Sequence, residues 1–356
     1  MSTSTLPAAS ARRPAARTPE APLLAQALTD VAALQRLRPE WEALWWQARA
    51  ATPFQSPQWL LPWCQHVGQG RLASVALRCP DSGTLVGFAP LYVYRHPESG
   101  QRHLFPLGIA TSDDHDILAR PGDEARVLQA LLAHLQEQGD AFDVFELPQL
   151  RSEAFVLRLA APPGWRLSIA EDDAHPVLAW ETAPAIAQAL AANLRTCRNR
   201  AARVGTLQFE TADAASLPAM LEALFALHTA RWSERAQAGV LADAAVRAWH
   251  RAAAPQLLAA GMLRLQGLRL DGEWIALAHV LADPAPAHAR RSRYYIGGFD
   301  PRHAALSPGA LLIHHAIASA HDEGARAFDF LRGAEPYKYR WGAVDEPRRV
   351  LRLWPR

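Results

Sequence analysis

Cysteine is scarce in this chain of 356 residues. Its three cysteines, Cys64, Cys79 and Cys197, form no C-x-x-C pair, which argues against a disulfide framework or a zinc ribbon and favours a reducing, cytoplasmic compartment. Long apolar runs are also missing from the sequence, and none reaches the roughly 18 residues that a membrane-spanning helix needs. The net charge of +2 is too small to indicate DNA as a partner.

Lysine is almost absent from the sequence. Of the 37 basic residues, 36 are arginine and one, Lys338, is lysine. This bias indicates that arginine has taken most positions where either cation serves. The remaining lysine therefore either falls at position 338 by chance or marks a place that requires a compact ammonium group.

What the chain does contain is the composition of a folded protein, half apolar and one fifth charged. Its length predicts two domains. Residues 1–22 are rich in Ala, Pro, Ser, Thr and Arg and lack the apolar segment of a signal peptide. We interpret them as a disordered tail, although an organelle transit peptide has a similar composition. The pattern of elements breaks at residues 176–184, so we expect one lobe over 23–178 and another over 179–356.

The two halves of the sequence repeat each other. Residues 131–147 and 316–333 both show an apolar-periodic helix, a glycine where the helix stops, and a strand that carries Phe-Asp. Residues 74–94 and 263–282 both show two strands around a turn, and the second turn is Asp-Gly, a strong hairpin signal.

A third match pairs Glu42-Ala-Leu-Trp with Glu222-Ala-Leu-Phe, each at the opening of a predicted helical stretch. The order of helix, hairpin, helix and strand is the same in both halves. Three matches in register predict a duplication, in which each half is an α/β unit built on a mixed sheet.

The second half carries the more informative loop. A predicted strand ends near Gly297-Gly298, which lets the backbone bulge or be approached closely. The run Ser307-Pro308-Gly309 is typical of a helix start, where unpaired amides and the positive dipole end suit a pyrophosphate. On their own, these features also fit an ordinary capped helix after a glycine bulge.

Three segments of the second half together resemble a known family. They are Tyr294-Tyr-Ile-Gly-Gly-Phe-Asp-Pro, Leu306-Ser-Pro-Gly-Ala-Leu-Leu, and Phe328-Asp-Phe-Leu-Arg-Gly-Ala-Glu-Pro-Tyr-Lys-Tyr-Arg-Trp-Gly. They resemble the CelD-like branch of the GNAT acetyltransferases, which is related to the Fem-type peptidoglycan aminoacyltransferases. The resemblance runs over residues 23–356, is densest over 190–342, and implies two tandem GNAT-like lobes with mixed sheets.

In that family a splayed strand before the Ser-Pro-Gly-type loop receives the acyl donor. The resemblance implies acetyl-CoA or another acyl-CoA as co-substrate. The loop departs from the common GNAT signature of Arg or Gln with two glycines, so an aminoacyl-tRNA donor of the Fem type stays open, although the small net charge disfavours tRNA. The residues expected to hold the donor are Gly297, Gly298, Phe299, Ser307, Pro308 and Gly309.

The first half offers no equivalent loop. Residues 104–119 place acidic side chains where free amides should meet a phosphate. We therefore expect the donor to bind only in the second half.

Acyl transfer needs a proton acceptor, stabilisation of the oxyanion and a proton for the leaving thiolate. Lys338 matches the lysine that Fem-type relatives carry after this strand, which implies that it stabilises developing negative charge. Tyr337 or Tyr339 would protonate the leaving group, unless both belong to a packed aromatic face. Glu335 is either a base or the ion partner of Lys338.

Acceptor-binding residues are expected on two segments of the second half. The arginine-rich segment 194–205 resembles a Fem-type helix in which Arg198 matches a phosphate-binding arginine, with Arg203 beside it; a solvated basic face is the alternative. Arg231 and Trp232 match a family pattern at the cleft between the lobes, although a tryptophan at this position also suits a core.

In the first half, Asp113, Asp114 and His115 form the densest polar cluster. The resemblance implies that they bind the acceptor, whereas their close spacing in a loop is also typical of turn and cap residues. We expect no metal, because no second His or Cys cluster accompanies them.

The sequence thus predicts an acyltransferase. It would move an acyl group, acetyl in the first instance, to an amino or hydroxy group of a small or sugar-linked acceptor, in polysaccharide or envelope biosynthesis. A Fem-like transferase that uses aminoacyl-tRNA and a non-catalytic binding protein with the same fold are the alternatives.

Overall fold

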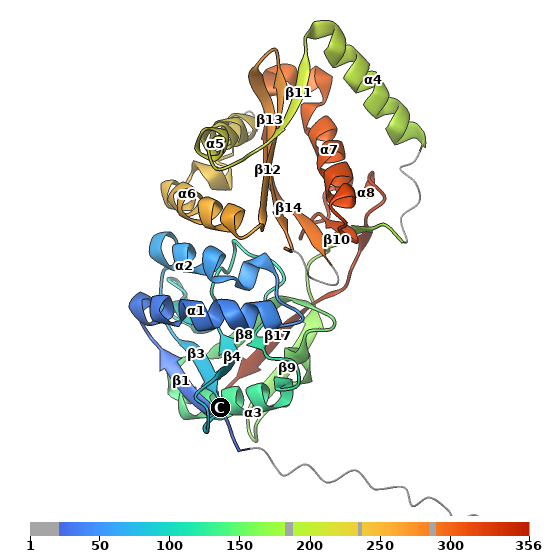
Figure 1. Ribbon diagram of the computed structural model, residues 1–356. Coiled ribbons are helices and arrows are strands. Elements are labelled where there is room, and N and C mark those ends of the chain that lie inside the picture. Colours follow the sequence, from blue (N-terminus) through green and yellow to red (C-terminus); the bar gives the residue numbers. More distant parts are fainter. Residues whose placement is uncertain (1–20, 182–187, 234–236, 285–289, 356) are drawn as a thin grey trace, which may run out of the picture.

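The computed structural model describes residues 21–181, 188–233, 237–284 and 290–355, which form two lobes (Figure 1). Lobe one consists of residues 21–175 and 346–355, and lobe two consists of residues 176–345. Almost all of the predicted tail, and part of the predicted boundary at 176–184, lie outside the described residues. Among the described helices, none is long and apolar enough to cross a bilayer.

Lobe one is built on two sheets, with strand orders β1-β3-β4-β7 and β2-β5-β6-β8-β17-β9. Its elements are β1 (Leu24–Leu28), α1 (Val31–Gln47), η1 (Pro53–Gln55), α2 (Pro57–His66), β2 (Arg71–Leu72), β3 (Ser74–Arg78), β4 (Leu85–Ala89), β5 (Leu91–Arg95), β6 (Arg102–Pro106), β7 (Leu118–Ala119), α3 (Glu124–Glu137), η2 (Gly139–Ala141), β8 (Val144–Arg151), η3 (Phe155–Arg158), β9 (Arg166–Glu171) and β17 (Arg348–Trp354).

Lobe two is built on one seven-stranded mixed sheet with the order β11-β12-β13-β14-β15-β10-β16. Its elements are β10 (Pro176–Ala179), α4 (Gln188–Val204), β11 (Leu207–Thr211), α5 (Leu217–Ser233), η4 (Val240–Ala242), α6 (Ala244–Ala259), β12 (Leu263–Leu270), β13 (Glu273–Ala282), β14 (Arg291–Phe299), η5 (Pro301–Leu306), α7 (Pro308–Asp322), β15 (Ala327–Asp329), α8 (Pro336–Tyr339) and β16 (Val344–Asp345).

The predicted repeat is visible in the order and pairing of the elements. The series β1-α1-α2-β3-β4 of lobe one matches β11-α5-α6-β12-β13 of lobe two. Further along, β6-α3-β8 matches β14-α7-β15, and in both lobes the two strands of this unit pair in parallel. The matched Glu-Ala-Leu segments lie inside α1 and α5 rather than at their openings, so that detail of the prediction was wrong.

The lobes exchange strands, which a division between residues 178 and 179 did not anticipate. β10 follows lobe one in the chain but pairs antiparallel with β15 of lobe two. The last strand, β17, follows lobe two but pairs antiparallel with β8 and β9 of lobe one. Each lobe therefore completes its sheet with the strand that ends the other half, and the chain crosses between the lobes twice.

The predicted turn residues behave differently in the two halves. Asp271 and Gly272 both have positive φ, 49° and 87°, as a two-residue type I′ hairpin requires. Gly324 has a φ of +80° just after α7, which confirms the predicted left-handed cap. Gly139 does not have positive φ, because α3 continues directly into the 3-10 turn η2.

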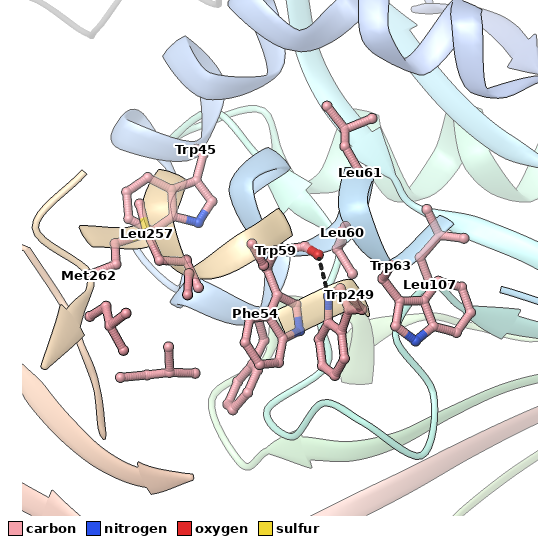
Figure 2. Packing of buried hydrophobic residues seen from close by; sticks show 14 of the residues in the cluster. Trp45, Phe54, Trp59, Leu60, Leu61, Trp63, Leu107, Trp249, Leu257 and Met262 are labelled. Atoms are coloured by element: carbon pink, nitrogen blue, oxygen red, sulfur yellow. Dashed lines mark hydrogen bonds between the residues drawn. The ribbon is translucent and has the colours of Figure 1, made fainter. Parts of the chain in front are cut away.

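An apolar core continues across the junction of the lobes (Figure 2). Trp59 of α2 and Trp249 of α6 are both fully buried, with ring centroids 4.5 Å apart in an edge-to-face arrangement. The indole Nε1 of Trp249 also donates a hydrogen bond of 3.2 Å to the Trp59 carbonyl. An aromatic pair of this kind stabilises the fold by about 0.5–1.5 kcal/mol beyond the free energy of burying its surface. Because this core contains residues of both lobes, the lobes form one structural unit.

Candidate functional site

The predicted splayed strand is β14. It pairs in parallel with β15 only from Arg291 to Arg293, the last pair being Arg293 with Asp329. β14 then continues to Phe299, held on its other edge by β13. The pairing with β13 shifts register beside Tyr295, which marks a bulge. Beyond Arg293, one edge of β14 is therefore no longer paired with β15, and we call this interruption of the pairing the gap between β14 and β15.

The N-terminus of α7 lies beside the end of this gap. A Cβ placed on Gly309 would meet Phe299 Cδ1 at 3.5 Å, an ordinary contact, and no other non-neighbouring heavy atom of the described chain within 4 Å. Ser307, Gly309 and Ala310 are half-buried rather than covered. Ser307 is the N-cap but has a left-handed φ of 53°, and its side chain accepts no capping bond, unlike the ordinary serine cap that we expected. The positive end of α7 is therefore accessible to an anion.

The two glycines of β14 have different neighbours. A Cβ on Gly298 would lie 2.4 Å from the backbone nitrogen of His228, so this glycine lets α5 pack directly on the sheet. A Cβ on Gly297 would lie 2.1 Å from the hydroxyl oxygen of Tyr294. Gly297 therefore lies on the side of the sheet that holds Tyr294, and Gly298 lies on the side that holds α5. The contact of Gly298 with the acyl donor stays a prediction.

A cation and two phenols gather near the free part of β14. The guanidinium of Arg231 lies 5.0 Å from the centre of the Phe299 ring, and its buried Nε has no hydrogen-bond partner among the described residues. Burial raises the pKa of Tyr294 and of Tyr337, and the charge of Arg231 opposes this rise in both. Both rings also pack on Phe330, with centroids 6.5 Å and 6.2 Å away. Both phenols therefore stay protonated at neutral pH.

Lys338 has a structural role in this arrangement. Its ammonium donates to the carbonyls of Leu331, Arg332 and Gly333 at 3.0, 2.6 and 3.0 Å and lies 2.9 Å from Glu335 Oε2. These bonds use all three protons, so the predicted stabilisation of an oxyanion by Lys338 does not fit. Glu335 is the ion partner of this lysine, the second of its two predicted roles. A compact ammonium is required because three carbonyls converge on one point.

The acidic cluster of lobe one lies buried between the lobes. Arg348 Nε donates to Asp114 Oδ1 at 3.0 Å, and Arg293 Nε donates to Asp114 Oδ2 at 3.4 Å. Burial alone would raise the pKa of Asp114, but Arg348, His175 and the other cations outweigh burial and hold its pKa below the usual range. Asp114 is fully buried, so the predicted contact with an acceptor is replaced by ion pairs that join the lobes.

The neighbours of Asp114 are also unavailable to an acceptor. Asp113 lies 3.1 Å from Arg332 of lobe two, and burial raises its pKa to about 6. His115 is buried, and burial together with Arg332 lowers its pKa to about 3, so the imidazole is neutral. Sequence reasoning missed the partners of this cluster, since nothing in the sequence pairs residue 114 with residues 293 and 348.

One group of three side chains among the described residues has the geometry of a metal site. The ligand atoms of Asp114, His175 and Asp329 lie within 4.8 Å of one another. Burial would lower the pKa of His175, but Asp329, 2.9 Å away, and Asp114 outweigh it and raise that pKa. Arg293 lies 3.4 Å from Asp114, and Arg348 lies 3.0 Å from Asp114 and 3.9 Å from Asp329, so the two arginines compensate the charge of these carboxylates. We therefore assign the group to the ion pairs between the lobes.

The remaining predicted residues lie on α4 and α5. Arg198 lines a groove between α4 and α7, whereas Arg203 is exposed near the end of α4 and does not line it. Trp232 is half-buried beside His228, with ring centroids 5.9 Å apart, and it closely approaches Gly239. The structure therefore brings Arg231, but not Arg198 or Arg203, to the phenols near β14.

Comparison with known proteins identifies a GNAT domain in lobe two and similar folds among solved structures. Residues 188–339, within lobe two, match the family model described as acetyltransferase (GNAT) domain. Comparison with curated proteins gives no significant match. The fold is similar to that of FemX, with a TM-score of 0.59 at 12% identity over 88% of this chain and 95% of that one.

Two further structures share the fold. L-PGS from Bacillus licheniformis gives a TM-score of 0.55 at 13% identity over 88% of this chain and 90% of that one. A conserved protein of unknown function from Bacteroides thetaiotaomicron gives a TM-score of 0.58 at 13% identity over 92% of this chain and 98% of that one. The class is therefore that of the GNAT acyltransferase-type fold. Within this class, the two-lobed fold of the chain is similar to that of FemX.

Proposed function

We propose that the protein transfers an acyl group, acetyl in the first instance, from acyl-CoA to an amino or hydroxy group of a small or sugar-linked acceptor. A role in polysaccharide or envelope biosynthesis belongs to the same proposal. The observation that carries it is the gap between β14 and β15, with the accessible start of α7 beside it. The diphosphate of CoA would lie at Ser307, Pro308 and Gly309, and the thioester along β14 near Gly297 and Phe299.

In the proposed reaction the acceptor nitrogen or oxygen attacks the thioester carbonyl carbon. Main-chain amides on the free edge of β14 stabilise the tetrahedral oxyanion. The carbon–sulfur bond then breaks, and the thiolate takes a proton from Tyr337, with Tyr294 as the alternative donor. The proton that the acceptor loses returns to the phenolate through solvent. Arg231 stabilises the negative charge near Phe299, and Trp232 lies on the same helix beside the acceptor.

A substitution at the start of α7 tests where the donor binds. Gly309→Glu and Gly309→Gln add side chains of the same size, but only glutamate adds a negative charge where the diphosphate would lie. Isothermal titration with acetyl-CoA should give an affinity at least about tenfold lower for Gly309→Glu than for Gly309→Gln, equivalent to about 1.4 kcal/mol. Equal affinities of the two variants would contradict this placement.

The resemblance to Fem-type enzymes and the fold shared with FemX support a second candidate, transfer from aminoacyl-tRNA. Titrating the natural chain with acetyl-CoA and with charged tRNA separates the alternatives. Binding of acetyl-CoA supports the proposal, and binding of tRNA alone supports the second candidate. Binding of neither leaves a non-catalytic protein that has kept the fold.

A further inference from the structure

A groove lies between α4, β11 and α7, outside the gap that the proposed reaction uses. Its volume is about 440 Å³. Leu194 and Leu311 are the buried residues of its apolar lining, while Arg195 and Arg198 enter from α4 and His314 and His315 enter from α7. No acidic side chain is among the residues that line this groove in the described part of the chain.

The two arginines of the groove have no partner. Neither Arg195 nor Arg198 forms an ion pair or side-chain hydrogen bond with any residue in the described ranges, whereas Arg200 of the same helix donates to the Ala305 carbonyl at 2.6 Å. Three residues apart on a helix, Arg195 and Arg198 lie on one face and present two unpaired guanidinium groups to the groove. Two neighbouring guanidinium groups that face the same groove can together bind a phosphate.

An aromatic platform stands beside these cations. The rings of Phe209 on β11 and His315 on α7 are stacked, with centroids 4.3 Å apart and an interplanar angle of 20°. Phe209 is 40% exposed, which is unusual for a large apolar side chain on a strand. An exposed ring next to unpaired arginines is the combination that binds a base together with its phosphate.

The groove is lined by the same helix, α7, whose first residues form the proposed donor site. Leu311 follows Gly309 by two residues, and His315 follows Gly309 by six, which corresponds to about 9 Å along the helix. Arg200 holds α4 to the Ala305 carbonyl, just before the start of α7. A ligand with its diphosphate at the start of α7 can therefore extend a nucleoside along the helix into the groove.

We propose that this groove holds the phosphorylated adenosine end of the acyl donor, with the base against Phe209 and the phosphate between Arg195 and Arg198. The inference rests on the proposed function, because it assigns the donor to the start of α7. An acceptor that carries uridine diphosphate would also offer a base and a phosphate to the groove. The test below distinguishes the acyl donor from such an acceptor.

The test is calorimetric titration of the full chain with CoA, with 3′-phosphoadenosine 5′-phosphate and with uridine diphosphate. The double substitution Arg195→Gln/Arg198→Gln should weaken binding of the first two at least tenfold, and Phe209→Ala about tenfold. The control Arg36→Gln/Arg38→Gln makes the same charge change on α1 of lobe one and should leave both affinities within twofold of the natural chain.

Each outcome decides the inference. If CoA binds but the α4 double variant binds it as tightly as the α1 control does, the groove is not the adenosine site, while the proposed function stands. If uridine diphosphate alone responds to the α4 substitutions, the groove serves the acceptor and the inference is wrong. If CoA does not bind at all, the proposed function fails. In that case, binding of 3′-phosphoadenosine 5′-phosphate that depends on Arg195 and Arg198 still supports the assignment of the groove. If 3′-phosphoadenosine 5′-phosphate does not bind either, both the proposed function and the assignment of the groove are wrong.

Discussion

The two lobes contain the same strand–helix–strand unit but differ at the start of its helix. In lobe two, α7 has no acidic residue in its first turn, and the half-buried Gly309 is its second residue. In lobe one, α3 begins at Asp123 and Glu124, and the Glu124 carboxylate accepts the Gly122 amide at 2.8 Å. A carboxylate thus occupies the position in lobe one that we assign to a phosphate in lobe two, so the proposed anion site is available at only one of the two helix starts.

A proline produces the second difference. β13 of lobe two is continuous from Glu273 to Ala282, whereas its counterpart in lobe one is divided at Pro90 into β4 and β5, which belong to different sheets. Proline has no amide to donate to a neighbouring strand, so the ladder breaks there. The split accompanies the loop of residues 107–117, which reaches lobe two through Asp113 and Asp114.

The largest effect is expected from the ion pairs between the lobes. Asp114→Asn keeps the side-chain shape and tolerates the left-handed φ of 50°, but it removes the charge that faces Arg348 and Arg293. Arg293 keeps Asp283 and Arg348 keeps Glu346 as partners, but losing the buried carboxylate that both arginines share should still cost about 3–5 kcal/mol of unfolding free energy. Urea denaturation measures this loss.

An exposed pair provides the control for Asp114→Asn. Glu222 and Arg251 form a salt bridge of 2.6 Å on the surface of lobe two. Glu222→Gln should cost less than about 1 kcal/mol, because solvent screens an exposed pair. Equal losses in the two variants would mean that the buried network does not join the lobes as described.

The next effect concerns the phenols of lobe two. Tyr337→Phe removes the proposed proton donor and should lower kcat about 100-fold, the contribution typical of general acid catalysis. Tyr339→Phe is the matched control, because it removes a hydroxyl that bonds to Asp345 at 2.8 Å, and kcat should not change. Steady-state kinetics with acetyl-CoA compares the two. A fall in both variants, or in neither, would remove Tyr337 from the mechanism.

A stability effect of intermediate size is expected in lobe one. Burial raises the pKa of Asp116 to about 7, above its value of 3.8 in the unfolded chain. The folded state therefore binds the proton more tightly, and the natural chain loses stability as pH rises from about 4 to about 7. Asp116→Asn keeps an acceptor for the Ile117 amide and should avoid that loss.

The variant Asp116→Asn should be close to the natural chain in unfolding free energy at pH 4 and exceed it at pH 8 by up to about 4 kcal/mol, the equivalent of about three pKa units. Denaturation curves at both pH values check this difference. A constant difference between the two chains across this range would show that Asp116 ionises normally.

The smallest effect is expected from a substitution at the start of α3, which corresponds to the start of α7 in lobe two. Glu124→Gln removes the charge at the start of α3, and we expect CoA binding to change by less than about 0.5 kcal/mol because lobe one holds no donor. Titration with CoA measures this, with Gly309→Glu as the lobe-two comparison. An additional CoA site in the Glu124→Gln variant would show that the Glu124 carboxylate alone prevents CoA from binding to lobe one.

Local signals allowed much of the fold to be predicted. The Asp271-Gly272 turn, the glycine after α7 and the repeated order of elements depend on residues near one another in sequence. The start of α7 at Pro308 was predicted for the same reason. The left-handed Ser307 was not, because its conformation depends on the preceding turn η5 rather than on the cap preference of serine.

Features that join distant residues were beyond sequence reasoning. The exchange of β10 and β17 follows from sheet pairing across the whole chain. Lys338 was predicted to be catalytic because it matches a lysine of Fem-type relatives and is the single lysine of the chain. The three carbonyls that bind it meet only in the folded chain. The acidic residues of lobe one could likewise not be separated into acceptor ligands and ion partners until their arginines were located.

The stoichiometry of CoA binding tests the central claim most directly. Isothermal titration of the natural chain with CoA should give one site per chain, and Gly309→Glu should weaken that site at least about tenfold relative to Gly309→Gln. Two sites per chain, or a single site that is insensitive to the charge at position 309, would contradict the account.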